Sequence, residues 1–153
     1  MEITIKLMRK ILIINALILF SLATFGQGKE NEKEWLQSYK DQVFYNGLLK
    51  GLGNKEVTDK LISLDKSFYN PVFIILHGKA IIKGSDYLVE LIRKDYDQQQ
   101  GRVAAPASGR RPFLVALRFY QSEKLNQMAK EEYNKWMKMP NRQKSINEAN
   151  NAY

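Results

Sequence analysis

Apolar residues recur at steps of three and four along most of the chain between positions 35 and 139. This spacing places them on one face of a helix, and no stretch of any length alternates apolar and polar residues as a half-buried strand does. The pattern therefore predicts an all-α fold, a compact bundle of five or six helices. The residues expected in its buried set include Trp35, Tyr39, Leu48, Leu61, Ile75, Leu88, Leu91, Leu117 and Leu125.

Turn and capping residues predict where the first two helices begin and end. The first helix starts near Trp35 and is expected to end at Gly51 and Gly53. Asn54 is a suitable N-cap for a short second helix, because its side-chain oxygen can accept a hydrogen bond from an unpaired backbone N–H. Glu56 then lies in the first turn, where the helix dipole favours a negative charge.

The apolar run at residues 72–76 (VFIIL) allows two interpretations. Its branched residues suit a buried strand, and periodicity alone does not separate such a strand from a buried helix. Asn70 followed by Pro71 is typical of a helix start, so the sequence favours a helix that continues to a stop at Gly84. Ser85 is then expected to cap a further helix.

The C-terminal half contains two more apolar helices after a segment without periodicity. Residues 97–112 (DQQQGRVAAPASGRRP) combine glycine, proline and arginine and read as a long loop. Residues 113–120 resume an apolar helix, and Ser122 is expected to cap the next one, which ends at Pro140. Residues 141–153 form a polar tail with little to bury.

The N-terminus predicts a cleavable signal peptide over residues 1–26. A positively charged start precedes the apolar run at 11–25, which as a helix would rise about 22 Å, short of a roughly 30 Å hydrocarbon core. Thr24 and Gly26 are small residues at the positions three and one before a cut that leaves Gln27 first. The alternative is an uncleaved membrane anchor. We expect processing, a periplasmic location and no stable membrane span afterwards.

The composition fits one domain, a helical domain over 27–140 between the signal peptide and the polar tail. The formal net charge is +8, of which about +6 remains after residue 26. For an exported basic domain we do not expect nucleic acid as a binding partner. We expect acidic protein surfaces, lipid headgroups or anionic envelope polymers instead. The chain has no cysteine, which excludes disulfides, thiol chemistry and cysteine metal sites.

Residues suited to catalysis are few and scattered. His77 is the only histidine and follows a very apolar run, so we expect it to be structural rather than a base or a metal ligand. Ser85 and Asp86 are explained by helix capping. Asp95 and Asp97 are close in sequence but lack the surroundings of a sugar-binding cleft. The sequence therefore predicts no catalytic residue, no metal site, no cofactor and no enzymatic activity.

The long loop carries the candidate partner-binding residues. A structureless segment of this length within a compact domain is often functional. Arginine is favoured at interfaces, because its planar guanidinium can bond carboxylates and carbonyls together. We predict partner contacts at Gln99, Arg102, Arg110 and Arg111. The alternative is a solvated loop with ordinary surface charge.

A local sequence pattern near the C-terminus is similar to that of a known protein family. Residues 114–130 (LVALRFYQSEKLNQMAK) contain a leucine-rich helix, an aromatic pair, a polar residue, a serine and an acidic-basic pair before a leucine. This stretch resembles the signature of type VI secretion amidase immunity proteins of the fourth subfamily. The matching positions are Leu117, Phe119, Tyr120, Ser122 and Leu125.

The resemblance is looser elsewhere and has one clear departure. Asp65, Gly84 and residues 87–96 (YLVELIRKDY) are similar to the middle helices of that family. Ala116 and Arg118 stand where the resemblance leads us to expect a cysteine and an acid. The early helix also lacks a cysteine, so both halves of a possible disulfide are missing together.

The resemblance implies an all-helical periplasmic immunity protein, often a homodimer. Such a protein binds a cysteine-dependent peptidoglycan amidase delivered by the type VI secretion system and occludes its active-site cleft. An alternative is a periplasmic helical adaptor or chaperone, which predicts a broad exposed apolar surface and promiscuous binding. A third reading is a small enzyme that binds or cleaves peptidoglycan, which requires a polar cleft with perturbed carboxylates.

Overall fold

The computed structural model describes residues 31–99, 102 and 109–152. Over these residues the chain forms six α-helices and no strand, so the predicted all-α fold is confirmed. The helices from Lys33 onward belong to one compact unit, Lys33–Tyr153. The predicted signal peptide at residues 1–26 lies outside the described residues.

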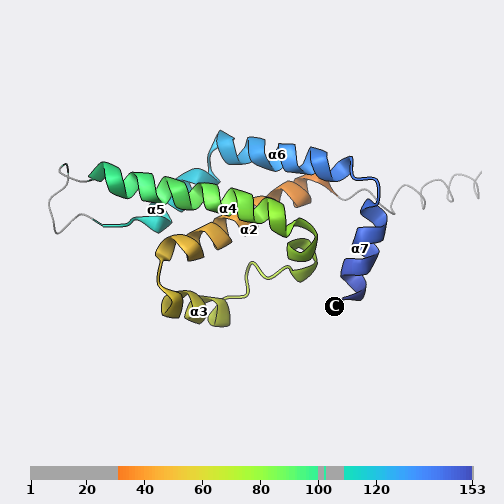
Figure 1. Cartoon of the computed structure of the whole chain (residues 1–153), viewed down its shortest axis with the longest axis horizontal. Coiled ribbons are helices and arrows are strands. Elements are labelled where there is room, and N and C mark those ends of the chain that lie inside the picture. Colours follow the sequence, from red (N-terminus) through yellow and green to blue (C-terminus); the bar gives the residue numbers. More distant parts are fainter. Residues whose placement is uncertain (1–30, 100–101, 103–108, 153) are drawn as a thin grey trace, which may run out of the picture. The chain divides into compact units, whose positions relative to one another are not determined.

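Helix α4 is the longest of the described helices, and α5, α6 and α7 all pack against it (Figure 1). The helices are α2 (Glu32–Leu52), α3 (Lys55–Leu64), α4 (Pro71–Gln99), α5 (Pro112–Tyr120), α6 (Glu123–Met137) and α7 (Arg142–Asn151).

Helices α2 and α4 cross closely because each places glycine against a large side chain of the other. A Cβ atom at Gly47 of α2 would lie 2.6 Å from Leu88 Cδ2 of α4. A Cβ atom at Gly84 of α4 would lie 2.6 Å from Val43 Cγ2 of α2. Gly51, one turn after Gly47, is equally crowded by the next apolar side chain of α4. The two backbones approach at a distance that only glycine allows at these positions.

The predicted break at Gly84 is therefore wrong, because α4 runs through it without interruption. Gly84 is buried at the crossing and serves packing rather than termination. Ser85 does not cap a helix. Its buried hydroxyl donates to the Ile81 carbonyl at 2.8 Å, the bond available to a serine inside a helix. The run at residues 72–76 is helical, as the sequence favoured.

The other predicted capping residues act as expected. Asn54, Asn70 and Ser122 each accept a hydrogen bond on the side-chain oxygen from the backbone N–H three residues later. Gly53 follows α2 with a φ of 64°, the left-handed conformation that favours glycine after a helix. Gly51 lies inside α2, so the helix ends only before Gly53.

Most of the predicted core is inside the bundle. The residues that are buried as expected are Trp35, Tyr39, Leu48, Leu88 and Leu125. Leu61 and Leu91 are half-buried. The prediction is wrong for Ile75 and Leu117, which are 52% and 50% exposed. Each belongs to a helix in which other apolar residues already occupy the inward face.

The polar segment after Pro140 is more structured than its composition indicates. Residues 142–151 form α7, which packs against α4. Ala149 is 3% exposed, and Ile146 packs against the core. The expected polar tail is thus a short polar helix that docks through a few apolar side chains.

An aromatic cluster joins α2, α4 and α6 around the only histidine. The Trp35 indole Nε1 donates to His77 Nε2 at 3.1 Å, and both side chains are buried. The rings of Phe73 and Trp136 lie 4.4 and 4.7 Å from the His77 ring, and Tyr133 lies against Trp35. Burial lowers the pKa of His77 to about 4, so the imidazole is neutral near pH 7.

Two glycines of α4 provide a matched test of the crossing. Replacing Gly84→Ala inserts a methyl group against the stiff, β-branched Val43, and we expect a loss of about 1–3 kcal/mol in the free energy of unfolding. Gly78→Ala meets no atom within 4 Å and should gain about 0.5–1 kcal/mol from helix propensity alone. Urea unfolding of the chain from Gln27 onward measures both. Equal stability of the two variants would contradict the packing role of Gly84.

Burial of His77 predicts a stability that depends on pH. The unfolded imidazole takes up a proton near pH 6.5 and the folded one near pH 4, so the unfolded chain binds more protons between these values. Stability from this group is complete above about pH 6.5 and falls as the pH is lowered toward 4, by about 2 kcal/mol between pH 7 and pH 5.

The control variant is His77→Gln, which retains an acceptor for the Trp35 indole but does not titrate. Glu132 and Lys135 line the same hollow as His77, and the pKa of Glu132 is lowered from its ordinary 4.5, so both remain charged above pH 5. Urea titrations across this range should show a flatter profile for His77→Gln. The same slope in both proteins would show that His77 is not the group responsible.

Candidate functional site

The end of α4 and the start of α5 bring the predicted partner-binding residues to one end of the bundle. Gln99 is the last residue of α4, Arg111 directly precedes α5, and Arg110 lies beside it. Arg102 lies in a turn three residues after α4. The predicted loop start at residue 97 is wrong, because α4 continues through Asp97 and Gln98 to Gln99, and residues 100, 101 and 103–108 lie outside the described residues. We call these four residues, with Asp95 and Gly109, the loop root.

Gln99 ties the two sides of the loop root together. Its side chain is 4% exposed. Its amide nitrogen donates to Asp95 Oδ2 at 3.0 Å, and its amide oxygen accepts from the Gly109 backbone N–H at 3.2 Å. Gln99 was predicted as a partner contact, but its bonds are internal and hold Gly109 against α4.

Arg111 forms a bidentate ion pair with the Asp95 carboxylate. Its Nε donates to Asp95 Oδ2 at 3.0 Å and its Nη2 to Asp95 Oδ1 at 2.6 Å. The hydrogen bonds from Arg111 hold the pKa of Asp95 below its ordinary value of 3.8, and the pair raises the pKa of Arg111. The planar guanidinium fits both oxygens at once, so this pair fixes direction as well as distance. It fastens the start of α5 to α4.

Arg102 and Arg110 present their charge outward. Both residues are exposed. The Arg102 backbone N–H donates to the Gln99 carbonyl at 3.0 Å, which positions its Cα just beyond α4. The Arg110 guanidinium extends over Gly53, where its Nη1 lies 2.6 Å from the position that a Cβ atom would take. Besides Arg111, which is paired with Asp95, the loop root therefore holds two exposed cations on an anchored backbone.

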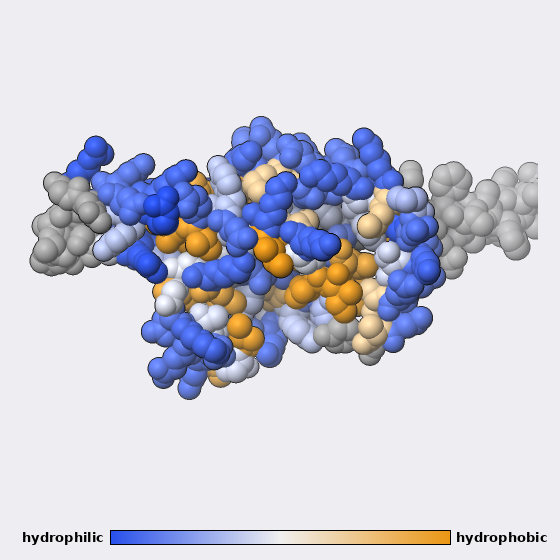
Figure 2. Space-filling view, viewed as in Figure 1, coloured by the Kyte–Doolittle hydropathy of each residue, from blue (hydrophilic) through white to orange (hydrophobic). Residues whose placement is uncertain are grey.

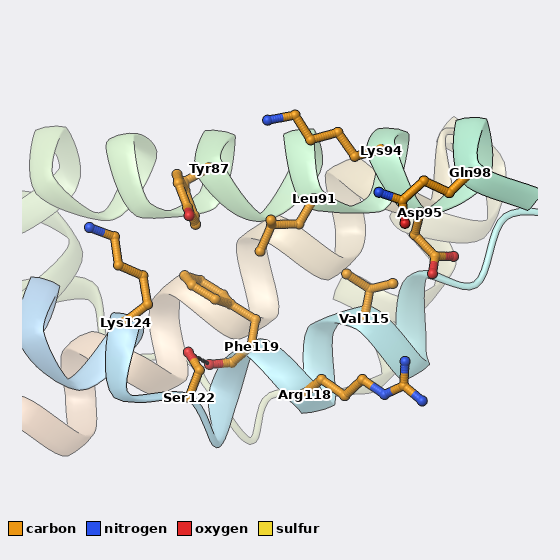
Figure 3. Close-up of a pocket in the computed structure, with 10 residues that line it drawn as sticks. All are labelled: Tyr87, Leu91, Lys94, Asp95, Gln98, Val115, Arg118, Phe119, Ser122 and Lys124. Atoms are coloured by element: carbon orange, nitrogen blue, oxygen red, sulfur yellow. Dashed lines mark hydrogen bonds between the residues drawn. The ribbon is translucent and has the colours of Figure 1, made fainter.

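A groove lies beside the loop root, between α4, α5 and the start of α6 (Figure 3). Its volume is about 400 Å³. Leu91, Val115 and Phe119 form its apolar floor, and Tyr87 is 40% exposed next to Phe119, with 5.4 Å between the two ring centroids. Asp95 belongs to both the groove and the loop root, so the two form one continuous surface.

Cationic side chains surround the floor of the groove. Lys94 comes from α4, Arg118 from α5 and Lys124 from α6. Lys124 Nζ lies 5.8 Å from the centroid of the Tyr87 ring, within range of a cation–π contact. Asp95 is the one acidic residue among those that line the groove. The rim is therefore positively charged around an apolar centre.

The sequence pattern did not reveal this groove, although it contains a partial signal. Tyr87, Leu91 and Asp95 are spaced four residues apart and thus share a face of α4. That spacing alone fits a face packed in the core equally well. Only the position of α5 shows that part of this face stays open.

Two features are absent from the described part of the chain. No helix there is both long and apolar enough to cross a membrane. No group of three or more histidine, cysteine or acidic side chains is placed there to hold a metal ion.

Comparisons of the chain with protein-family models, with curated proteins and with solved structures found no match.

The clasp formed by Asp95, Gln99 and Arg111 predicts a local effect of substitution. Asp95→Asn removes the charge that Arg111 pairs with and weakens the carboxylate bonds at both sides of the loop root. We expect the Gly109 amide to exchange with solvent several-fold faster, measured by NMR. Asp97→Asn is the matched control, since Asp97 pairs only with the exposed Arg93 among the bonds described. Unchanged exchange at Gly109 in Asp95→Asn would show that the clasp does not hold the loop root.

Proposed function

We propose that the domain after residue 26 is a periplasmic immunity protein, which binds a secreted peptidoglycan amidase and occludes its active site. The observation that carries this proposal is the loop root, in which Arg102 and Arg110 are exposed on a backbone fastened by Gln99 and Arg111. A fastened backbone loses less conformational entropy on binding than a free one. The site is thus prepared to present positive charge to a partner.

The resemblance and the geometry concern the same part of the molecule. The signature residues lie in α5 and at the start of α6, the two helices that form one wall of the groove. Phe119 and Ser122 line the groove, whereas Leu125 is fully buried. Ser122 also caps α6, so it shapes this wall as well as lining it. The amidase as partner comes from the resemblance.

The positive charge of the loop root would affect the rate of association more than the affinity. Exposed arginines and lysines steer an acidic partner and accelerate association, and this effect weakens as salt is added. Exposed ion pairs contribute little net energy, so the affinity must come mainly from groups that become buried. Arg118 stands where the resemblance leads us to expect an acid, and this change favours a partner with a different charge pattern.

A helical adaptor or chaperone is the second candidate, because large apolar side chains are exposed on several helices. Figure 2 shows apolar surface on the viewed face of the molecule, broken up by polar side chains. Among the large apolar residues that the structure describes, the most exposed are Leu64, Phe113, Tyr69, Ile82, Ile75 and Leu117. A continuous patch would favour promiscuous binding of unfolded clients. Apolar positions interspersed with charge suit a specific interface better.

The proposal is tested with a charge-reversed loop root. Arg102→Glu combined with Arg110→Glu leaves the clasp of Asp95, Gln99 and Arg111 intact. This double variant should inhibit an amidase encoded by a neighbouring gene about thirtyfold more weakly than the unchanged protein does. Inhibition is measured as peptide release from purified peptidoglycan. The control variant, Lys138→Glu with Lys144→Glu, makes the same change in net charge just after α6 and within α7 and should inhibit nearly as well as the unchanged protein.

Two outcomes would contradict the proposal. A folded loop-root variant that inhibits normally would make the exposed arginines irrelevant. An unchanged protein that inhibits no amidase, yet suppresses aggregation of unrelated unfolded proteins, would instead support the adaptor function.

A further inference from the structure

The groove has a property that the loop root lacks, namely an apolar hollow in which the Tyr87 side chain is exposed to solvent. Tyr87 is 40% exposed, while Phe119 beside it is 4% exposed and Val115 is 8% exposed. The floor is thus packed firmly from below, and the hollow above it has room for a side chain of a partner. Aromatic and apolar residues set in such a hollow are typical anchor sites in protein interfaces.

The carboxylate that lines the groove offsets only part of the positive charge of its rim. Arg111 bonds both oxygens of Asp95. Lys94 lies 3.7 Å from Glu90, but Arg93 holds the same Glu90 oxygen at 2.7 Å. Arg118 also interacts electrostatically with Asp95, but three cations against one lining carboxylate leave the rim with a net positive charge that can attract negative groups from outside.

The cations also lie on different walls. In Figure 3, Lys94 projects from α4 on one side of the floor and Arg118 from α5 on the other. Lys124 lies at the end near Tyr87. A chain that crosses the floor could bond cations on both sides, whereas a flat lipid surface would contact one side and leave the hollow empty.

We propose that this groove binds an acidic peptide segment of the partner protein, which inserts one apolar side chain onto the floor. The carboxylates before and after that side chain bond to Lys94, Arg118 and Lys124. The apolar side chain covers the exposed part of Tyr87 and fills the hollow above Leu91. The identification of the segment with an amidase rests on the proposed function, while the chemistry of the segment rests on the groove.

The first experiment uses synthetic peptides and needs no amidase. The probe is a capped seven-residue peptide with a central phenylalanine and three acidic residues on each side. Titration into the ¹⁵N-labelled chain, from Gln27 onward, should shift amide signals of residues 87–98 and 115–124. Alanine at the centre should weaken binding about tenfold, and glutamine in place of the acidic residues should weaken it by a similar factor.

Reversing two charges on the rim of the groove tests whether its cations bind the peptide. Lys94→Glu with Arg118→Glu should weaken peptide binding at least tenfold, while Lys138→Glu with Lys144→Glu leaves it nearly unchanged. Circular dichroism confirms that each variant is folded. Leu91 and Phe119 are left unaltered, because they support the core as well as the floor.

The outcomes separate this inference from the proposed function. Peptide binding that depends on the rim and on the central phenylalanine supports the inference, even if no amidase is inhibited. Absence of binding, or binding that the rim variant does not affect, overturns it, even if an amidase is inhibited through the loop root. Rim-dependent binding to phosphatidylglycerol vesicles without binding to the peptide also overturns it, since the ligand would then be a lipid surface.

Discussion

The close crossing of α2 and α4 at Gly47 and Gly84 determines where the other helices can lie. With Leu88 seated over one glycine and Val43 over the other, the two axes are held at a separation that a methyl group would increase. Helix α4 must therefore be continuous through Gly84, and its two halves are held in one orientation. The features on either half of α4 depend on that continuity.

Each half of α4 has a separate task because the helix is long and rigid. The first half carries Phe73 and His77 into the aromatic cluster with α2 and α6. The second half carries one wall of the groove and the carboxylate of Asp95. The aromatic cluster is buried and fixed, whereas the groove is open and positively charged. The buried aromatic cluster and the open groove thus lie on different halves of one helix.

Much of the fold could be predicted from local signals in the sequence. Asn54, Asn70 and Ser122 cap helices as predicted, because a cap bonds to a backbone group only three residues away. Gly84 misled the prediction, since a glycine that ends a helix and one that admits a neighbouring helix look alike in sequence. The site was only partly predictable for the same reason. Asp95 and Arg111 are sixteen residues apart, and their pairing depends on how α5 returns to α4.

The clasp at the loop root separates the length of the loop from the stability of the bundle. Gln99 and Gly109 are bonded to each other, so the chain between them closes a ring whose ends are already fixed. Each doubling of such a ring costs only about 0.6 kcal/mol in closure entropy. Insertions or exchanges between these two residues would leave the helices below almost undisturbed. The bundle is in this sense a scaffold with an exchangeable segment, on which new specificities can arise, or be grafted, without redesign of the core.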